Sequence, residues 1–381
     1  MDFDFTEEQS MLEESIERLV ADRYGFEQRS AHLAAADGWS REMWSTYADM
    51  GLLGLPFASS DGGLGGGPVD TMIVMEAMGR GLVVEPYFAS IILAGGCLRA
   101  AASEKQRAAL IPGIVAGESL VSLAHSESQA RYELANVRTS AHREGDQWVM
   151  NGSKRFVLHG DSADKLIVSA RVGGEQRARE GLALFVVDAR APGVTRRGYL
   201  TQDRLRAADI ELANVRVSDA DVIGAAGGAL PIIEQAVDQA LAALCAEAVG
   251  VMTKAHELTV DYLKTRKQFG VNIGSFQALQ HRAVDMLVMI EQARSMALFA
   301  AMMADHPDAV ERGKAMSAAK VQINKSARFV GQQAVQLHGG IGVTEECHAG
   351  HYFRRLSMIE LGLGDTDHHL AALARVGGLL T

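Results

Sequence analysis

The chain has 381 residues, of which 48% are hydrophobic, so it can bury the cores of two or three domains. Its formal net charge of −10 argues against binding nucleic acid or an anionic membrane, because polyanions bind basic patches. The three cysteines form no CxxC pair, which excludes a disulfide framework and a zinc site. The N-terminus lacks the basic start of a signal peptide, and no apolar run reaches the ~18 residues of a membrane span. We therefore expect a cytoplasmic protein.

Residues 1–118 are predicted to form an N-terminal helical domain. Thr6 with Gln9 makes a capping box before an apolar repeat of helical spacing. Ser103 with Gln106 gives the same start signal later in the domain. Both pairs predict helix N-termini.

A glycine-rich stretch, residues 62–67, interrupts this helical region. It resembles a phosphate-binding loop, but no Lys-Ser/Thr pair follows it and no strand precedes it. The stretch is therefore interpreted as a flexible connector, with Pro68 opening the next helix.

Residues 119–224 are predicted to form a middle β-domain. The apolar period changes to two, and β-branched residues accumulate in KLIVSAR and LALFVVD. Asn151-Gly152 predicts a hairpin turn between WVM and SKRFV. Short strands without helices between them indicate a small antiparallel barrel or sandwich.

Residues 225–381 return to helical periodicity and are predicted to form an antiparallel bundle, because long helices joined by short connections pack in this way. The fold class is therefore mainly α with a central β-domain. The expected helices span 230–263, 276–305, 310–337, 349–360 and 366–376.

Two segments of this last region, YLKTRKQFGVNIGSFQALQHRAVDM and QLHGGIGVTEECHAGHYFRRL, stand in order about 50 residues apart. Both resemble signature segments of the acyl-CoA dehydrogenase family. The resemblance implies the three-part fold of that family, FAD as cofactor and α,β-dehydrogenation of an acyl-CoA thioester. It also implies an electron-transfer flavoprotein as electron acceptor.

The same segments contain the residues expected to bind the cofactor. A fixed cation and an amide near a helix end suit a pyrophosphate, and adjacent glycines let a ligand approach the backbone. The resemblance implies that these residues hold FAD mainly across a subunit interface. They are Arg266, Gln268, Phe269, Gln277, Gln336, Gly339 and Gly340.

The usual catalytic carboxylate is missing. In the family, a Glu near the C-terminus removes the α-proton of the thioester, but the corresponding residue here is Gly364. Other members carry their Glu on the first long bundle helix, where this chain has Ala240. Asp365 and Glu247 are the remaining candidates for a base, although a helix glutamate is more often a paired or solvated group.

The expected flavin seat, residues 126–133 and 157–159, also departs from the family pattern. Ser126 is retained and is a cofactor candidate, as is Thr366, but the Gly-Ser pair of the first segment is absent. Leu158 replaces a threonine and provides no hydroxyl donor.

The residues expected to seat the chain's own flavin are altered, whereas those expected to reach a neighbour's flavin are intact. This combination predicts a subunit of a mixed complex. The resemblance extends to paired bacterial members that assemble as α2β2 tetramers in steroid and dicarboxylate degradation. The chain is then the non-catalytic partner that clamps the FAD of a second acyl-CoA dehydrogenase subunit. Two alternatives stay open: a self-sufficient dehydrogenase that uses Asp365 or Glu247, and another flavoenzyme or monooxygenase on the same fold.

The sequence D-x-D-H-H at 365–369 resembles a set of metal ligands. Aspartates at a helix start more often cap backbone amides, so no metal site is expected.

Overall fold

The computed structural model describes residues 4–377, so the outermost residues of the predicted first and third domains lie outside the described part. The described chain forms two compact units. Unit 1 combines the N-terminal segment up to Ala31 with Pro68–Val83 and the chain from Leu241 onward, and unit 2 contains His32–Gly67 and Val84–Ala240. The division at 118 and 224 remains a prediction, because the N-terminal helices are shared between the two units.

Unit 1 is helical, and its long helices match the predicted segments to within a few residues. Helix α7 (Leu230–Thr265) begins in unit 2 and continues into unit 1. The other elements are α1 (Glu7–Arg23), α2 (Phe26–Ala34), α4 (Pro68–Gly81), α8 (Gln277–Met303), α9 (Ala309–His338), α10 (His348–Leu361), α11 (Thr366–Arg375), the short hairpin strands β9 (Lys267–Gln268) and β10 (Val271–Asn272), and the 3-10 turns Ile273–Ser275 and Gly339–Val343.

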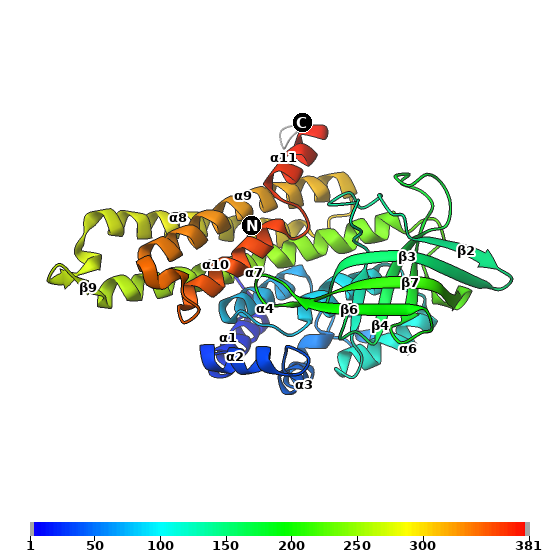
Figure 1. The fold of residues 1–381 in the computed structure, drawn as a ribbon, viewed down its shortest axis with the longest axis horizontal. Helices are drawn as coiled ribbons and strands as arrows, with labels where there is room; N and C mark the ends of the chain where they lie inside the picture. The colour runs from blue at the N-terminus through cyan, green and yellow to red at the C-terminus, as the bar shows by residue number, and fades with distance from the viewer. Residues whose placement is uncertain (1–3, 378–381) are drawn as a thin grey trace. The chain divides into compact units, whose positions relative to one another are not determined.

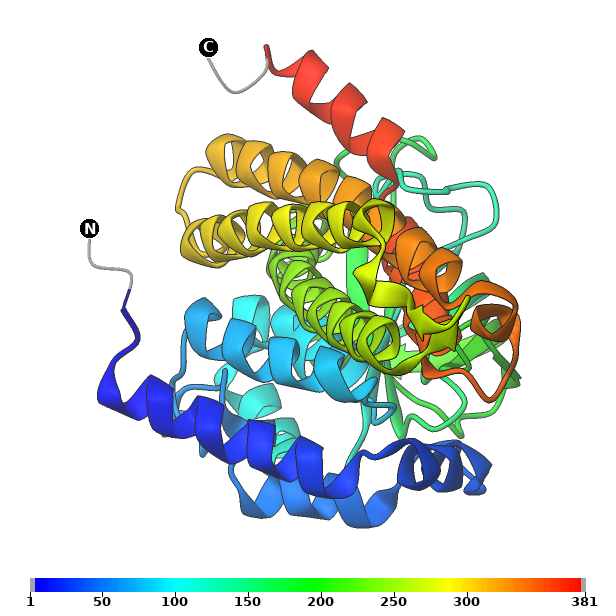
Figure 2. The ribbon, with the colours of Figure 1, turned by 90° about the vertical axis from the view of Figure 1, so that its left-hand side faces the viewer.

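Antiparallel packing organises this unit, with α8 and α9 lying side by side in both views (Figures 1 and 2). Glycines bring α4 and α7 into backbone contact. A Cβ added at Gly79 would lie 2.2 Å from the Glu247 carbonyl, and one added at Gly250 would lie 1.9 Å from the Glu76 carbonyl. Larger residues at these two positions would force the helices apart.

Unit 2 contains an eight-stranded sheet with the order β6-β7-β3-β2-β4-β5-β8, and β1 pairs with β4. Most pairs are antiparallel, while β4 pairs in parallel with both β1 and β2. The strands are β1 (Val121–Ala124), β2 (Ser140–Glu144), β3 (Gln147–Leu158), β4 (Lys165–Arg171), β5 (Leu182–Asp188), β6 (Val194–Leu200), β7 (Arg206–Ser218) and β8 (Val222–Ile223). The helical elements are α3 (Arg41–Asp49), α5 (Gly95–Ala101), α6 (Glu104–Val115), a π-helix (Tyr87–Ala94) and three short 3-10 turns (Leu52–Gly54, Ser59–Asp61, Asp219–Asp221).

The predicted hairpin turn at Asn151-Gly152 is wrong, because β3 runs without interruption through both residues. The pairing with β7 shifts register between Met150 and Gly152, which marks a β-bulge. A Cβ at Gly152 would lie 2.5 Å from the Thr139 hydroxyl, so the glycine permits a close approach of chains. The turn itself lies between β2 and β3, where Gly145 has a φ of +65°.

Both predicted capping boxes are confirmed, at Thr6 with Gln9 and at Ser103 with Gln106. Pro68 opens α4 as predicted. The stretch 62–67 is not a loose connector, however. Backbone N–H groups of residues 62–66 donate to carbonyls of residues 54–59, so the glycines form a hydrogen-bonded loop.

Two helices are long and apolar enough to cross a membrane by length and composition. The apolar window of α7 is 83% buried, as in the core helix of a folded protein, and that of α8 is 33% buried. Length and composition alone are weak grounds for a span, and α8 leaves an apolar surface exposed.

Candidate functional site

The residues expected to bind the cofactor gather at one end of unit 1. Arg266 directly follows α7, Gln268 and Phe269 belong to the β9–β10 hairpin, and Gln277 begins α8. The remaining three, Gln336, Gly339 and Gly340, lie at the end of α9. The rings of Tyr262 and His338 stack with centroids 4.5 Å apart, which joins the end of α7 to the end of α9. We call these seven residues the clamp.

The clamp is exposed. Its side chains lie on the surface, and Phe269 is 90% exposed, an unusual environment for a large aromatic ring. No atom lies within 4 Å of a Cβ added at Gly339 or Gly340. A cation, an amide and open glycine backbone can accommodate an anionic dinucleotide approaching from outside the chain.

The position of the usual catalytic base contains no proton acceptor. Gly364 lies in the segment Leu361–His369 that links α10 to α11, here called the base segment. The Asp365 carboxylate accepts a hydrogen bond from the His368 backbone N–H at 2.9 Å and caps α11, as expected for an aspartate at a helix start. Thr366 is the first residue of α11.

Glu247, the second candidate base, lies on α7 and is buried. Its carboxylate accepts two hydrogen bonds from the Arg355 guanidinium, with Nε–Oε1 at 2.5 Å and a second N–O distance of 2.6 Å. Such a bidentate pair is charge-assisted and directs both carboxylate oxygens at the arginine. This arrangement is typical of a structural ion pair.

The flavin seat retains an ordered backbone despite its altered sequence. The Ser126 carbonyl accepts from the Arg155 N–H at 2.8 Å. Arg131 occupies the glycine position of the family pattern and adopts a φ of +49°, in the left-handed region that favours glycine. Its guanidinium lies 5.3 Å from the ring centroid of Tyr132, which replaces the family serine. The left-handed turn is therefore formed with bulky side chains in place of the family's Gly-Ser pair.

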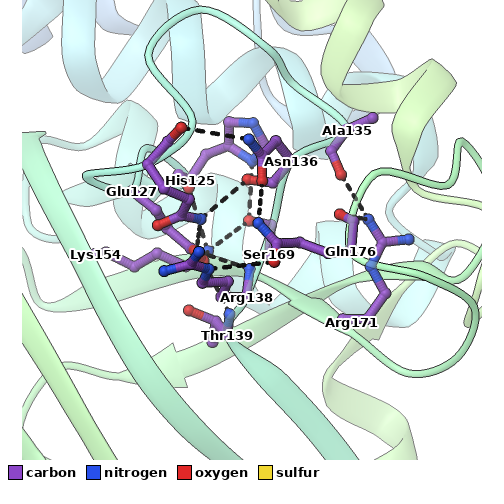
Figure 3. Close-up of polar contacts among 11 residues, drawn as sticks. His125, Glu127, Ala135, Asn136, Arg138, Thr139, Lys154, Ser169, Arg171 and Gln176 are labelled. Atoms are coloured by element: carbon purple, nitrogen blue, oxygen red, sulfur yellow. Dashed lines mark hydrogen bonds and ion pairs between the residues drawn. The ribbon is translucent and has the colours of Figure 1, made fainter.

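A buried ion pair supports this seat from beneath (Figure 3). The Lys154 ammonium donates to Glu127 Oε1 at 2.8 Å and to Ser169 Oγ at 3.0 Å, and it is fully buried. Glu127 also accepts from the backbone N–H groups of Arg138 and Thr139. Burial opposes ionisation of Glu127, but Lys154 and these hydrogen bonds outweigh it and lower the pKa of the carboxyl to about 2.

His125 completes this network. Its Nδ1 lies 2.9 Å from Ser169 Oγ, and burial together with the Lys154 charge lowers the pKa of the imidazole to about 3. The ring is therefore neutral beside a charged pair, and the network fixes both ends of the loop that begins at Ser126.

Sequence reasoning missed Lys154, Lys320 and Arg355, which hold the backbone or the candidate carboxylates in place. Lys320 offered a signal, because small and apolar residues of α9 flank it on both sides in the sequence, in Ala318-Ala319 and Val321. A lysine in such a position is either exposed or satisfied by buried acceptors.

Family comparisons match all three parts of the chain. The N-terminal, middle and C-terminal domains of acyl-CoA dehydrogenase match residues 6–118, 122–215 and 228–378. The chain is 30% identical to the pig (Sus scrofa) mitochondrial long-chain specific acyl-CoA dehydrogenase over 80% of its own length and 71% of the relative's. It is 28% identical to the probable acyl-CoA dehydrogenase YngJ of Bacillus subtilis, over 98% of this chain and 99% of that one.

Among solved structures, the chain is similar to a variant of a steroid ACAD named for two components, Tcur3481 and Tcur3483. The identity is 29%, the TM-score is 0.86 and 97% of each chain is covered. These matches define a flavoprotein oxidoreductase of the class that acts on CH–CH bonds. The chain belongs to the acyl-CoA dehydrogenase family, whose members depend on FAD, and the fold expected from the sequence is confirmed.

Proposed function

We propose that this chain is the non-catalytic subunit of a heteromeric acyl-CoA dehydrogenase and that it clamps FAD seated on a second, related subunit. The observation that carries the proposal is a contrast between two sites. The clamp presents an exposed cation, amides and bare glycine backbone, whereas the position of the base is a glycine. FAD bound between the subunits would supply the hydride-accepting chemistry, and this chain would contribute Arg266 and Gln268 to binding it.

The exposed face of α8 supports an assembly of subunits. Apolar side chains stand at positions 284, 287, 288, 299 and 302, each between 37% and 56% exposed. Exposed apolar surface of this extent on one helix is typical of a protein–protein contact. A second acyl-CoA dehydrogenase subunit in an α2β2 complex is the partner we infer, and the name of the similar steroid ACAD, which contains two components, supports a mixed assembly.

The finer resemblance is to the small subunit of pimeloyl-CoA dehydrogenase, based on the start MDFDFTEEQ, on GLLGLPFASSDGGLGGGP and on GDTDHHL. The first three residues of that start lie outside the described residues. We propose an acyl-CoA substrate derived from a dicarboxylate or a steroid, a cytoplasmic location, and an electron-transfer flavoprotein as acceptor. Arg155, a candidate for binding a distal carboxylate, already pairs with Glu211 at 2.7 Å.

A self-sufficient enzyme finds less support, because Asp365 caps α11 and Glu247 is paired with Arg355. No feature of the described residues favours a different flavin chemistry over dehydrogenation.

Flavin absorbance of the chain purified with and without its partner subunit tests the proposal. We expect FAD only in the complex, and one FAD per chain with dehydrogenation in the isolated protein would contradict it. Arg266→Ala should lower the FAD content of the complex, because the clamp loses its cation. Arg18→Ala, which removes another exposed arginine on α1, is the matched control and should leave the FAD content unchanged.

A further inference from the structure

Three buried polar residues of α9 hold the base segment from below. Ser317, Lys320 and Asn324 follow one another at spacings of three and four, so they lie on one face of the helix. The Lys320 ammonium donates to Asn324 Oδ1 at 2.7 Å and to the Gly364 carbonyl at 3.1 Å. It also donates to the Ile359 carbonyl at 2.8 Å, near the end of α10. The backbone at Gly364 is therefore fixed in place.

His369 belongs to this segment and packs against Gly364. Its ring is 2% exposed, and its Nδ1 lies 3.2 Å from Ser317 Oγ. The other ring nitrogen, Nε2, is buried without a hydrogen-bond partner. Burial, with the Lys320 and His368 charges, lowers the pKa of the imidazole to about 3, although the Leu363 carbonyl and Asp365 oppose the shift. The ring is therefore neutral at physiological pH.

The space above Gly364 is filled by these imidazoles. A Cβ added at residue 364 would lie 2.4 Å from His369 Nε2 and 2.7 Å from His368 Cδ2. The φ of Gly364 is +126°, which L side chains rarely adopt. Since Lys320 and Asn324 hold its carbonyl, the backbone cannot retreat from the rings without breaking those hydrogen bonds.

We propose that the His369 ring occupies the space that a side chain at position 364 would need, so that residue 364 must be glycine. The inference rests on the proposed function in one respect, the assignment of residue 364 to the base position. Its consequence is that substitution at 364 alone cannot restore a base to this chain. The absence of a carboxylate at position 364 and the position of the His369 ring therefore depend on each other.

A double-variant cycle on the full-length chain tests this proposal. Gly364→Ala should lower the thermal midpoint by roughly 4–10 °C, from backbone strain plus overlap with the ring. In the His369→Ala background the same change should cost clearly less, because the overlap with His369 is gone and only the strain and the contact with His368 remain. Gly145→Ala is the matched control. Gly145 has a φ of +65° and no atom within 4 Å of an added Cβ, so its cost should be equal in both backgrounds.

Equal losses from Gly364→Ala with and without His369 would overturn the proposal. If Gly364→Ala alone yields no folded chain, folding of the double variant supports the inference, and failure of the double variant while His369→Ala folds overturns it. NMR of the ring supplies a second readout: Gly364→Ala should shift the His369 Nε2 and Hε1 signals, and unmoved signals contradict the overlap. Both measurements are independent of flavin, so their failure is distinguishable from a failure of the FAD-content experiment.

Discussion

The clamp and the base segment belong to the same compact unit, and both depend on glycines, but the glycines meet opposite surroundings. Around Gly339 and Gly340 no atom occupies the space of a side chain, whereas at Gly364 two imidazole rings occupy it. The clamp exposes Phe269, while the base segment buries Lys320 and His369. The comparison separates two uses of glycine: one leaves room for a molecule from outside, and the other makes room for the chain's own residues.

The difference also indicates where the chain tolerates change. Residues of the clamp contribute little to the chain's own packing, so their identity is not explained by stability. Residues around Glu247 and Gly364 are surrounded by partners, and their identity follows from packing and hydrogen bonding. Substitutions in the clamp should therefore lower FAD retention with little change in stability, whereas substitutions around Glu247 and Gly364 should lower stability.

The largest loss of stability is expected at the buried ion pair between Glu247 and Arg355. Arg355→Ala leaves the Glu247 carboxylate buried without its guanidinium and should cost about 3–5 kcal/mol of unfolding free energy. Denaturant titration measures it. Arg354→Ala, which breaks a pair with the exposed Glu345, is the control and should cost below about 1 kcal/mol. Similar costs for both variants would show that Glu247 is not held as described.

Lys154→Met tests whether the buried ion pair stabilises the backbone of the expected flavin seat. It leaves Glu127 buried and charged without its ammonium partner, at a cost of about 3–4 kcal/mol in a denaturant titration. Lys165→Met removes a partly exposed lysine from β4 and should cost below about 1 kcal/mol. Amide exchange of residues near Ser126 should rise only in the first variant, and an unchanged rate there would contradict the supporting role of the pair.

The pH dependence of stability reports on the protonation of His369 and His125. Both imidazoles have a folded pKa of about 3, while an unfolded histidine titrates near pH 6.5. Between these values the unfolded state binds more protons, so unfolding free energy is complete above about pH 6.5 and falls as the pH is lowered. Each histidine contributes about 1.4 kcal/mol per pH unit inside this window.

His369→Ala should therefore reduce the slope of unfolding free energy against pH by about 1.4 kcal/mol per unit between pH 4 and 6. His281→Ala, at an exposed position on α8, is the matched control. Parallel curves for the wild type and His369→Ala would mean that the ring binds protons equally in the folded and unfolded chain, which contradicts the lowered pKa.

The smallest effect on stability is expected in the clamp. Phe269→Ser should change unfolding free energy by no more than about 0.5 kcal/mol, because the ring is 90% exposed. The FAD content of the complex should fall, since Phe269 lies in the same hairpin as Gln268 and its ring is available to a ligand. Met11→Ser, at a 63% exposed position on α1, should change neither quantity. Retention of FAD by Phe269→Ser would remove this residue from the clamp.

Helix positions were predictable from the sequence because they depend on local signals. The capping boxes at Thr6 and Ser103 and the apolar stripe of α7 act over a few residues, and the structure confirms them. Asn151-Gly152 misled for the same reason. Locally it favours a turn, but β3 gains two neighbouring strands by continuing, and the glycine serves a bulge instead.

The clamp residues could be named from the sequence because they lie in two continuous motifs. The contacts of Glu247 and Gly364 could not be predicted. Arg355 lies 108 residues from Glu247 and Lys320 lies 44 residues from Gly364, and the packing of His369 against Gly364 depends on how the chain turns between them. The left-handed Arg131 was also hidden, since sequence predicts such a φ at glycine but not at arginine. These features depend on tertiary packing rather than on local propensity.

The glycine contact between α4 and α7 has a consequence for biosynthesis. Unit 1 needs Gly79 and Gly250 together, so its N-terminal helices cannot complete their packing until about 170 further residues have been synthesised. Unit 2 finishes earlier, because its last residue is Ala240. During that interval the apolar faces of α1 and α4 are without their final neighbours, and a chain released early would expose them to aggregation and proteolysis.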